Sequence, residues 1–153
     1  MRIAGYKWLF VETGTRWPHG VALVSGYDAH TWTRGPNQAT YPPSPDNLWG
    51  FNAYHDAWRA RWSGQVYGTV IVGVTGFGAV ELYRRGWRAE KAEIVAVHLP
   101  RGLAGRRLDA IDRGPGAERL RLAYDVPVLR SLRALRRETE RWGVPGRRLL
   151  GSE

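Results

Sequence analysis

The densest run of β-branched and aromatic residues lies between residues 65 and 99, where glycines interrupt it at short intervals. No helical spacing of apolar residues occurs until this stretch has ended. Such a pattern is typical of consecutive antiparallel strands. We predict strands at 66–75, 78–84 and 88–98, with a bulge or turn at 76–78 and a tight turn at Arg85–Gly86.

The first 64 residues predict shorter elements. Strands are expected at 2–11, 21–27 and 49–54, followed by a short helix that begins after its N-cap Asp56 and ends near Trp62. Residues 28–47 form a long irregular stretch with several prolines. A loop of that length inside a compact domain is usually functional or disordered.

The C-terminal third predicts one clear helix, at 126–142. Asp125 is a natural N-cap, and Pro127 fits the first turn, where its missing N–H is not needed. Residues 101–117 carry only a weak pattern, with at most one helical turn at 106–112. One face of the predicted helix collects the apolar side chains Val128, Leu129, Leu132, Leu135 and Trp142.

Together these elements predict a single α+β domain. Its core is an antiparallel sheet or a small, partly open barrel, with one short helix and a C-terminal helix. Residues 1–100 would form the β-rich core, and residues 101–153 an arginine-rich helical extension that packs on it.

Composition narrows the class of protein. The 153 residues are enough for one domain with a genuine core. The absence of cysteine excludes disulfides, thiolate metal sites and cysteine nucleophiles. No apolar run reaches the length of a membrane helix, and no signal peptide is evident. We therefore expect a cytoplasmic protein without a membrane partner.

Positive charge is concentrated towards the C-terminus. The net charge is +9, and residues 101–153 hold thirteen arginines against seven acids, whereas Lys7 and Lys91 are the only lysines. Such a balance favours an anionic partner, most commonly nucleic acid, although a solvated charged face is the plainer explanation. The candidate phosphate-binding residues on and after the predicted helix are Arg130, Arg133, Arg137, Arg141, Arg147 and Arg148.

Aromatic residues gather beside the predicted loops of the first 62 positions. They suit a stacking surface for bases, a groove for a small molecule, or simply the core of a small sheet. The sequence does not decide among these three. The candidate ligand or stacking residues are Trp17, Trp32, Trp49, Tyr54, His55 and Trp58.

Motifs for catalysis or metal binding are weak. The four histidines lack metal-binding spacing, so we expect no metal and no cofactor. Residues 73–78 are glycine-rich but lack the order of a phosphate-binding loop, which favours a glycine bulge. His55 lies at a strand-to-helix junction beside the long loop, and it is where an enzymatic site would be centred.

Two motifs carry a family resemblance. The segments Trp49-Gly-Phe-Asn-Ala-Tyr54 and Gly86-Trp-Arg-Ala-Glu90 resemble those of small uncharacterised proteins from actinobacteria and their phages. Relatives often have cysteine where this chain has Trp49. The resemblance covers about half the chain and implies the same strand organisation, but no activity.

Three functions remain open from the sequence. The first is a non-enzymatic module that binds nucleic acid or a nucleoprotein through the arginine-rich C-terminal region. The second is a protein–protein adaptor or assembly subunit, including a homo-oligomer, that uses the Trp and Tyr surface. The third is an enzyme for a small ligand or nucleotide, centred on His55 and the 28–47 loop.

Overall fold

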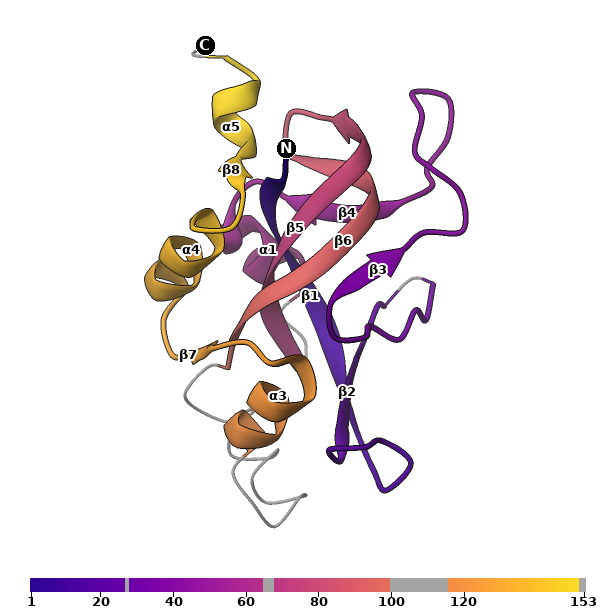
Figure 1. The fold of residues 1–153 in the computed structure, drawn as a ribbon. Helices are drawn as coiled ribbons and strands as arrows, with labels where there is room; N and C mark the ends of the chain where they lie inside the picture. The colour runs from indigo at the N-terminus through magenta and orange to yellow at the C-terminus, as the bar shows by residue number, and fades with distance from the viewer. Residues whose placement is uncertain (27, 65–67, 100–115, 152–153) are drawn as a thin grey trace.

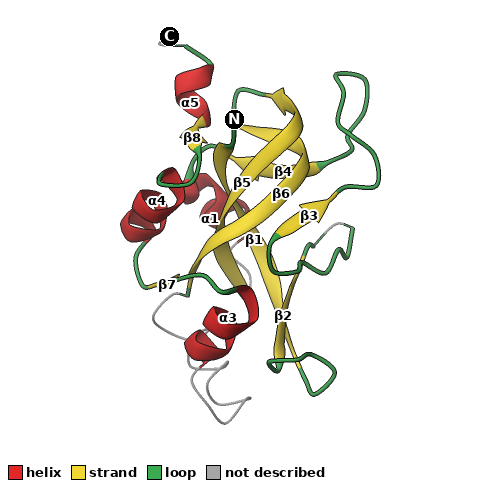
Figure 2. Cartoon of the chain, in the orientation of Figure 1, coloured by secondary structure: helices red, strands yellow, loops and turns green. Residues whose placement is uncertain are grey.

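The computed structural model describes residues 1–26, 28–64, 68–99 and 116–151, which form one mixed α+β domain (Figures 1 and 2). Eight strands make a single, mainly antiparallel sheet. The antiparallel sheet is as the sequence predicts, but six strands were expected. The strands are β1 (Ile3–Thr13), β2 (Val21–Val24), β3 (Pro36–Gln38), β4 (Phe51–Tyr54), β5 (Thr69–Leu82), β6 (Gly86–His98), β7 (Val128–Leu129) and β8 (Val144–Pro145). The described helices are α1 (Ala57–Gly64), α3 (Gly116–Tyr124), α4 (Leu132–Glu140) and α5 (Gly146–Leu149).

The long β5–β6 hairpin forms the centre of the sheet (Figure 1). Its turn is where the sequence predicts it: the Tyr83 N–H donates to the Gly86 carbonyl over 2.8 Å. The predicted strands at 66–75 and 78–84 are instead one strand, β5, with irregular register after Gly73 and after Phe77. Gly76 within β5 makes room for the ring of Trp87, with which a Cβ there would collide.

Strand β1 pairs directly with β5 of the hairpin and is connected to β6 through β4. It pairs antiparallel with β5 along Ile3–Phe10 and with β2 along Phe10–Thr13. Strand β4 lies between β1 and β6, and β3 pairs with the middle of β6. The stretch predicted to be irregular at 28–47 therefore contributes a short strand.

The prediction of a single C-terminal helix at 126–142 is wrong. Helix α3 ends at Tyr124, and Asp125 follows it with a positive φ of 54°, so this residue ends one helix instead of starting another. Val128 and Leu129 form β7, parallel to Val97–His98, because the edge of β6 offers backbone hydrogen-bonding groups at this point. No local pattern could reveal that edge.

Helix α4 has its own start and a shorter length than predicted. Its N-cap is Ser131, whose hydroxyl accepts a hydrogen bond from the Ala134 N–H over 3.1 Å. Trp142 follows the helix and is 56% exposed, so it does not share the buried face as expected. The helical turn suggested at 106–112 lies outside the described residues.

The two faces of the sheet are both covered by apolar side chains. On one face, Leu9, Val72 and Val74 pack with Trp32 and Leu120 in the larger core. On the other face, a smaller core places α1 and α4 against the sheet; its buried members are Tyr6, Ala57, Ala60, Ile71, Ala96, Leu132 and Leu135. This second core determines where the arginines of α4 lie.

None of the helices that the structure describes is long and apolar enough to cross a lipid bilayer.

Candidate functional site

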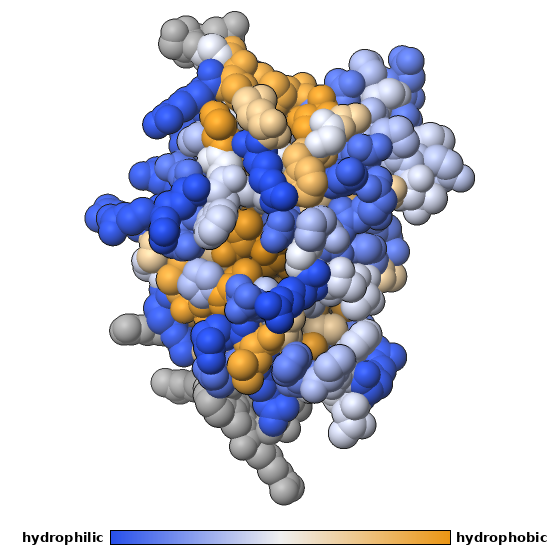
Figure 3. All heavy atoms as spheres, in the orientation of Figure 1, coloured by the Kyte–Doolittle hydropathy of each residue, from blue (hydrophilic) through white to orange (hydrophobic). Residues whose placement is uncertain are grey.

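The exposed side of α4 and α5 is strongly cationic. Seven arginines and two glutamates lie between residues 130 and 148, and all seven arginines are exposed. Figure 3 shows hydrophilic side chains gathered over α4. We call this surface the arginine face; it comprises Arg130, Arg133, Arg136, Arg137, Arg141, Arg147 and Arg148.

Two arginines of this face have partners within the chain. Arg130 donates to the Leu99 carbonyl over 3.5 Å, and Arg141 forms an ion pair with Glu138 at 3.0 Å. The remaining five have no acidic side chain within ion-pair distance in the described part of the chain. Their charge is therefore available to an outside anion.

The packing of α4 explains why its arginines point outward. Leu132, Leu135 and Thr139 recur at intervals of three and four and are buried against the sheet. A Cβ on Gly73 of β5 would overlap the hydroxyl of Thr139, so the helix lies very close to this strand. The arginines occupy the remaining, solvent-facing part of the helix.

A cleft of about 260 Å³ opens where α4, α5 and the start of α1 meet. Arg133 and Arg136 of α4, Arg147 of α5 and the aromatic side chain of Trp58 of α1 all line it. Trp58 is 56% exposed. The cleft thus combines three cations with an accessible aromatic ring; we call it the α1–α4 cleft.

One carboxylate also lines the α1–α4 cleft, but it is already engaged. Asp56 caps α1, as predicted, and its side chain accepts a hydrogen bond from the Trp58 N–H over 2.8 Å.

Tyr6 lies close to Asp56 and Glu140. Burial raises the pKa of its hydroxyl, and the nearby charge of Glu140 raises that pKa further. Tyr6 therefore stays neutral at physiological pH and adds no negative charge.

His55 lines the same cleft in a supporting position. Its Nε2–H donates to the Tyr83 carbonyl over 2.8 Å, and its Nδ1 is buried without a partner, against Gly146 at the start of α5. His55 as a whole is only 8% exposed, and no residue of the 28–47 loop lines the cleft. His55 thus fixes the position of α5 relative to the β5–β6 turn.

The predicted aromatic cluster is spread over separate regions. Trp32 is 2% exposed and belongs to the core, where it packs at 4.9 Å from Phe51, so it is unavailable for stacking on a base. Trp17 lies in the β1–β2 loop under Arg16. Trp49 stacks with Tyr41 at 4.4 Å in the segment between β3 and β4.

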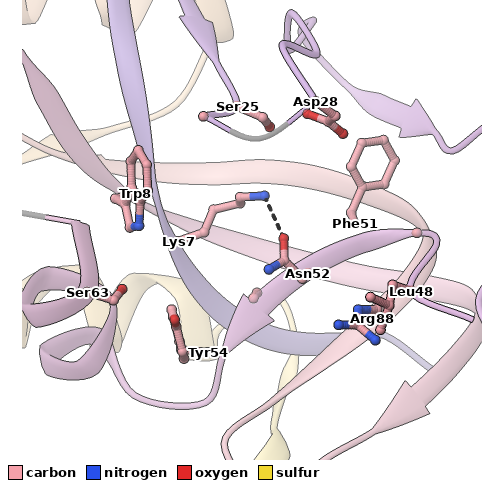
Figure 4. A pocket seen from close by; sticks show the side chains of 13 residues that line it. Lys7, Trp8, Ser25, Asp28, Leu48, Phe51, Asn52, Tyr54, Ser63 and Arg88 are labelled. Carbon is pink, nitrogen blue, oxygen red and sulfur yellow. Dashed lines mark hydrogen bonds between the residues drawn. The ribbon is translucent and has the colours of Figure 1, made fainter.

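A second, larger cavity of about 490 Å³ lies between β1, β4 and the segment after β2 (Figure 4). We call it the Lys7 cavity. Lys7 donates from Nζ to Asn52 Oδ1 over 3.2 Å, and its Nζ lies 5.3 Å from the centre of the Trp32 ring. Tyr54, one of the predicted ligand residues, lines this cavity and not the α1–α4 cleft.

Burial lowers the pKa of Lys7 from 10.5 to about 8, and only the charge of Asp28 opposes this shift. The sequence does not reveal this site, because a single lysine in a strand forms no motif. One feature of the sequence does single out Lys7. The chain has twenty-one arginines but only two lysines, and Lys7 is one of the two.

Metal ligands do not assemble in the described ranges. Across residues 1–26, 28–64, 68–99 and 116–151, no group of three His, Asp or Glu side chains could hold a metal ion. The expectation that the protein needs no metal stays a prediction.

No protein-family model, no curated protein and no solved structure matches the chain. The resemblance to small actinobacterial and phage proteins therefore stays a prediction.

Proposed function

We propose that the protein is a non-enzymatic binding module for nucleic acid, and that it prefers single strands. The observation that carries the proposal is the α1–α4 cleft, where Arg133, Arg136 and Arg147 face a cavity that they share with the exposed ring of Trp58. Cations beside an accessible aromatic ring suit a phosphate backbone together with an unstacked base.

The charge balance of the arginine face supports phosphate binding. Six of its seven arginines lack an ion pair among the described residues, so binding does not first have to break such pairs. Each phosphate that an arginine neutralises releases condensed counterions, which favours association at low salt. A guanidinium also matches two phosphate oxygens at once.

Aromatic exposure on α1 supports the preference for single strands. Trp58 and Trp62 lie one helical turn apart and are 56% and 81% exposed. Side chains four residues apart share one helix face. Bases in a duplex are already stacked on one another, so such rings contribute more to the binding of a single strand.

The test compares two triple variants with the same loss of charge. We expect Arg133→Gln/Arg136→Gln/Arg147→Gln to weaken binding of a labelled single-stranded oligonucleotide by at least about 10-fold in fluorescence anisotropy at low salt. The control removes Arg16, Arg34 and Arg121, which form ion pairs with Glu12, Asp125 and Glu118 outside the cleft. The control should change affinity by less than about 3-fold.

Trp58→Ala separates stacking from charge. We expect it to weaken single-strand binding by about 5- to 100-fold, with little effect on a duplex of the same length.

Equal effects of the two triple variants on affinity would mean that only net charge matters, and the α1–α4 cleft would be abandoned as the binding site.

The adaptor hypothesis has one observation in its favour. Leu48 and Trp49 are 78% and 51% exposed beside Tyr41, away from the arginine face. If the wild-type protein binds no nucleic acid at low salt but its mass rises with concentration in light scattering, the adaptor proposal replaces the one above.

A further inference from the structure

The position of Lys7 in its strand is unusual for a charged residue. Every second residue of a strand faces the same side, so Ile3, Lys7 and Leu9 of β1 point the same way. Ile3 and Leu9 are buried in the larger core. Lys7 therefore leaves β1 on the core side. Its Nζ has one hydrogen-bond partner, the neutral amide oxygen of Asn52, and no carboxylate within ion-pair distance among the described residues.

We propose that the Lys7 cavity binds a small aromatic carbonyl compound that carries a carboxylate, and that Lys7 captures its carbonyl carbon as an imine. The proposal is independent of nucleic-acid binding, since it uses none of the residues of the arginine face.

The lining of the cavity identifies the class of ligand. Phe51, Trp8 and Tyr54 line the cavity, and Figure 4 shows the Lys7 side chain pointing away from Trp8, towards Asn52 on the side where Phe51 lies. Phe51 belongs to the larger core, whereas Trp8 and Tyr54 also pack against the smaller core. A volume of about 490 Å³ is in the range of small-molecule sites. Flat aromatic walls of this kind favour a planar, apolar ligand body.

A second cation suits the carboxylate. Arg88 of β6 lies directly opposite Asn52 of β4 in the sheet, and it lines the same cavity as Lys7. Its guanidinium can donate hydrogen bonds to both oxygens of a carboxylate. Arg88 donates from Nη1 to the Tyr83 hydroxyl over 3.4 Å, and it has no carboxylate within ion-pair distance among the described residues, so its charge is left for a ligand. The carboxylate of a ligand then pairs with Arg88 at the side of the cavity away from Trp8.

The chemistry requires no further reagent. The nitrogen lone pair of neutral Lys7 attacks the carbonyl carbon, a C–N bond forms, and the carbonyl oxygen leaves as water with the two amine protons. The product is a C=N bond. Burial lowers the pKa of Lys7 to about 8, so a substantial fraction of the amine is neutral and nucleophilic near neutral pH.

The test uses 4-formylbenzoate as the probe and cyanoborohydride to reduce the imine to a stable secondary amine. Lys91 and the α-amine of the chain are internal references, because Lys7 and Lys91 are the only lysines. Peptide mapping by mass spectrometry should find Lys7 labelled at least about 10-fold faster than either reference. Comparable rates at all three amines would overturn the proposal.

The variant Arg88→Gln tests the carboxylate contact. It should slow labelling of Lys7 by 4-formylbenzoate at least about 5-fold and leave labelling by uncharged benzaldehyde unchanged. The same slowing with both aldehydes would contradict the assigned ligand class. The rate ratio between Lys7 and Lys91 in the wild-type protein stands as a test even if this variant folds poorly.

Discussion

Tyr124 connects α3 to the sheet through its buried hydroxyl. The hydroxyl accepts from the Leu23 N–H over 2.7 Å and donates to the Trp32 carbonyl over 2.9 Å. Tyr124→Phe leaves both backbone groups buried without a partner, so we expect it to lower the free energy of unfolding by about 1–3 kcal/mol. Urea denaturation measures the loss, and Tyr41→Phe, at a side chain that is 53% exposed, is the control. A loss no larger than that of the control would contradict the hydrogen-bonding role.

Lys7 has a predictable effect on stability at alkaline pH. Its pKa is about 8 in the folded protein, whereas in the unfolded chain it takes the ordinary value of 10.5. Between these two pH values the unfolded chain therefore binds more protons than the folded protein. Native stability should therefore rise with pH across this window relative to a variant without the amine. Below about pH 8 the full cost of burying the charge is present.

We expect Lys7→Met to be more stable than the wild type near pH 7, by on the order of 1–3 kcal/mol. The difference in free energy of unfolding between the two proteins should shrink as the pH rises from about 8 to 10.5. Denaturant titrations at several pH values measure it, and shifts of other groups, such as Tyr6, cancel in the difference. A difference independent of pH would show that the amine is well solvated.

Helix α4 depends on its apolar face at the scale of secondary structure. Leu132 is 5% exposed in the smaller core, so Leu132→Ala should lower the free energy of unfolding by about 2–4 kcal/mol. Leu122 of α3 is 46% exposed, and Leu122→Ala is the matched control, with an expected change below about 0.5 kcal/mol. Equal losses in denaturant melts would mean that α4 does not pack as described.

Local chemistry predicted some elements because their signals lie within the element. The Arg85–Gly86 turn and the Asp56 cap of α1 follow from turn and capping residues alone. The C-terminal helix was mispredicted since two signals competed. Asp125 and Pro127 resemble a helix start, but the free edge of β6 captures the next two residues as β7. Such an edge exists only after the sheet has formed.

The whole molecule brings functional residues together from distant positions. The sequence predicted the exposed arginines of α4, because charge opposite an apolar stripe needs only helical periodicity. It could not predict that Trp58 of α1 lines one cleft with Arg133 and Arg147, since more than seventy residues separate them along the chain. The Lys7 cavity likewise requires the pairing of β1, β4 and β6.

The salt dependence of single-strand binding tests the central claim most directly. The logarithm of the association constant should fall linearly with the logarithm of salt concentration for the wild-type protein. In the variant Arg133→Gln/Arg136→Gln/Arg147→Gln the slope should be shallower by about 2, since each lost phosphate contact on a single strand contributes about 0.7. An unchanged slope, or no binding by the wild type at about 50 mM salt, would contradict a phosphate-binding arginine face.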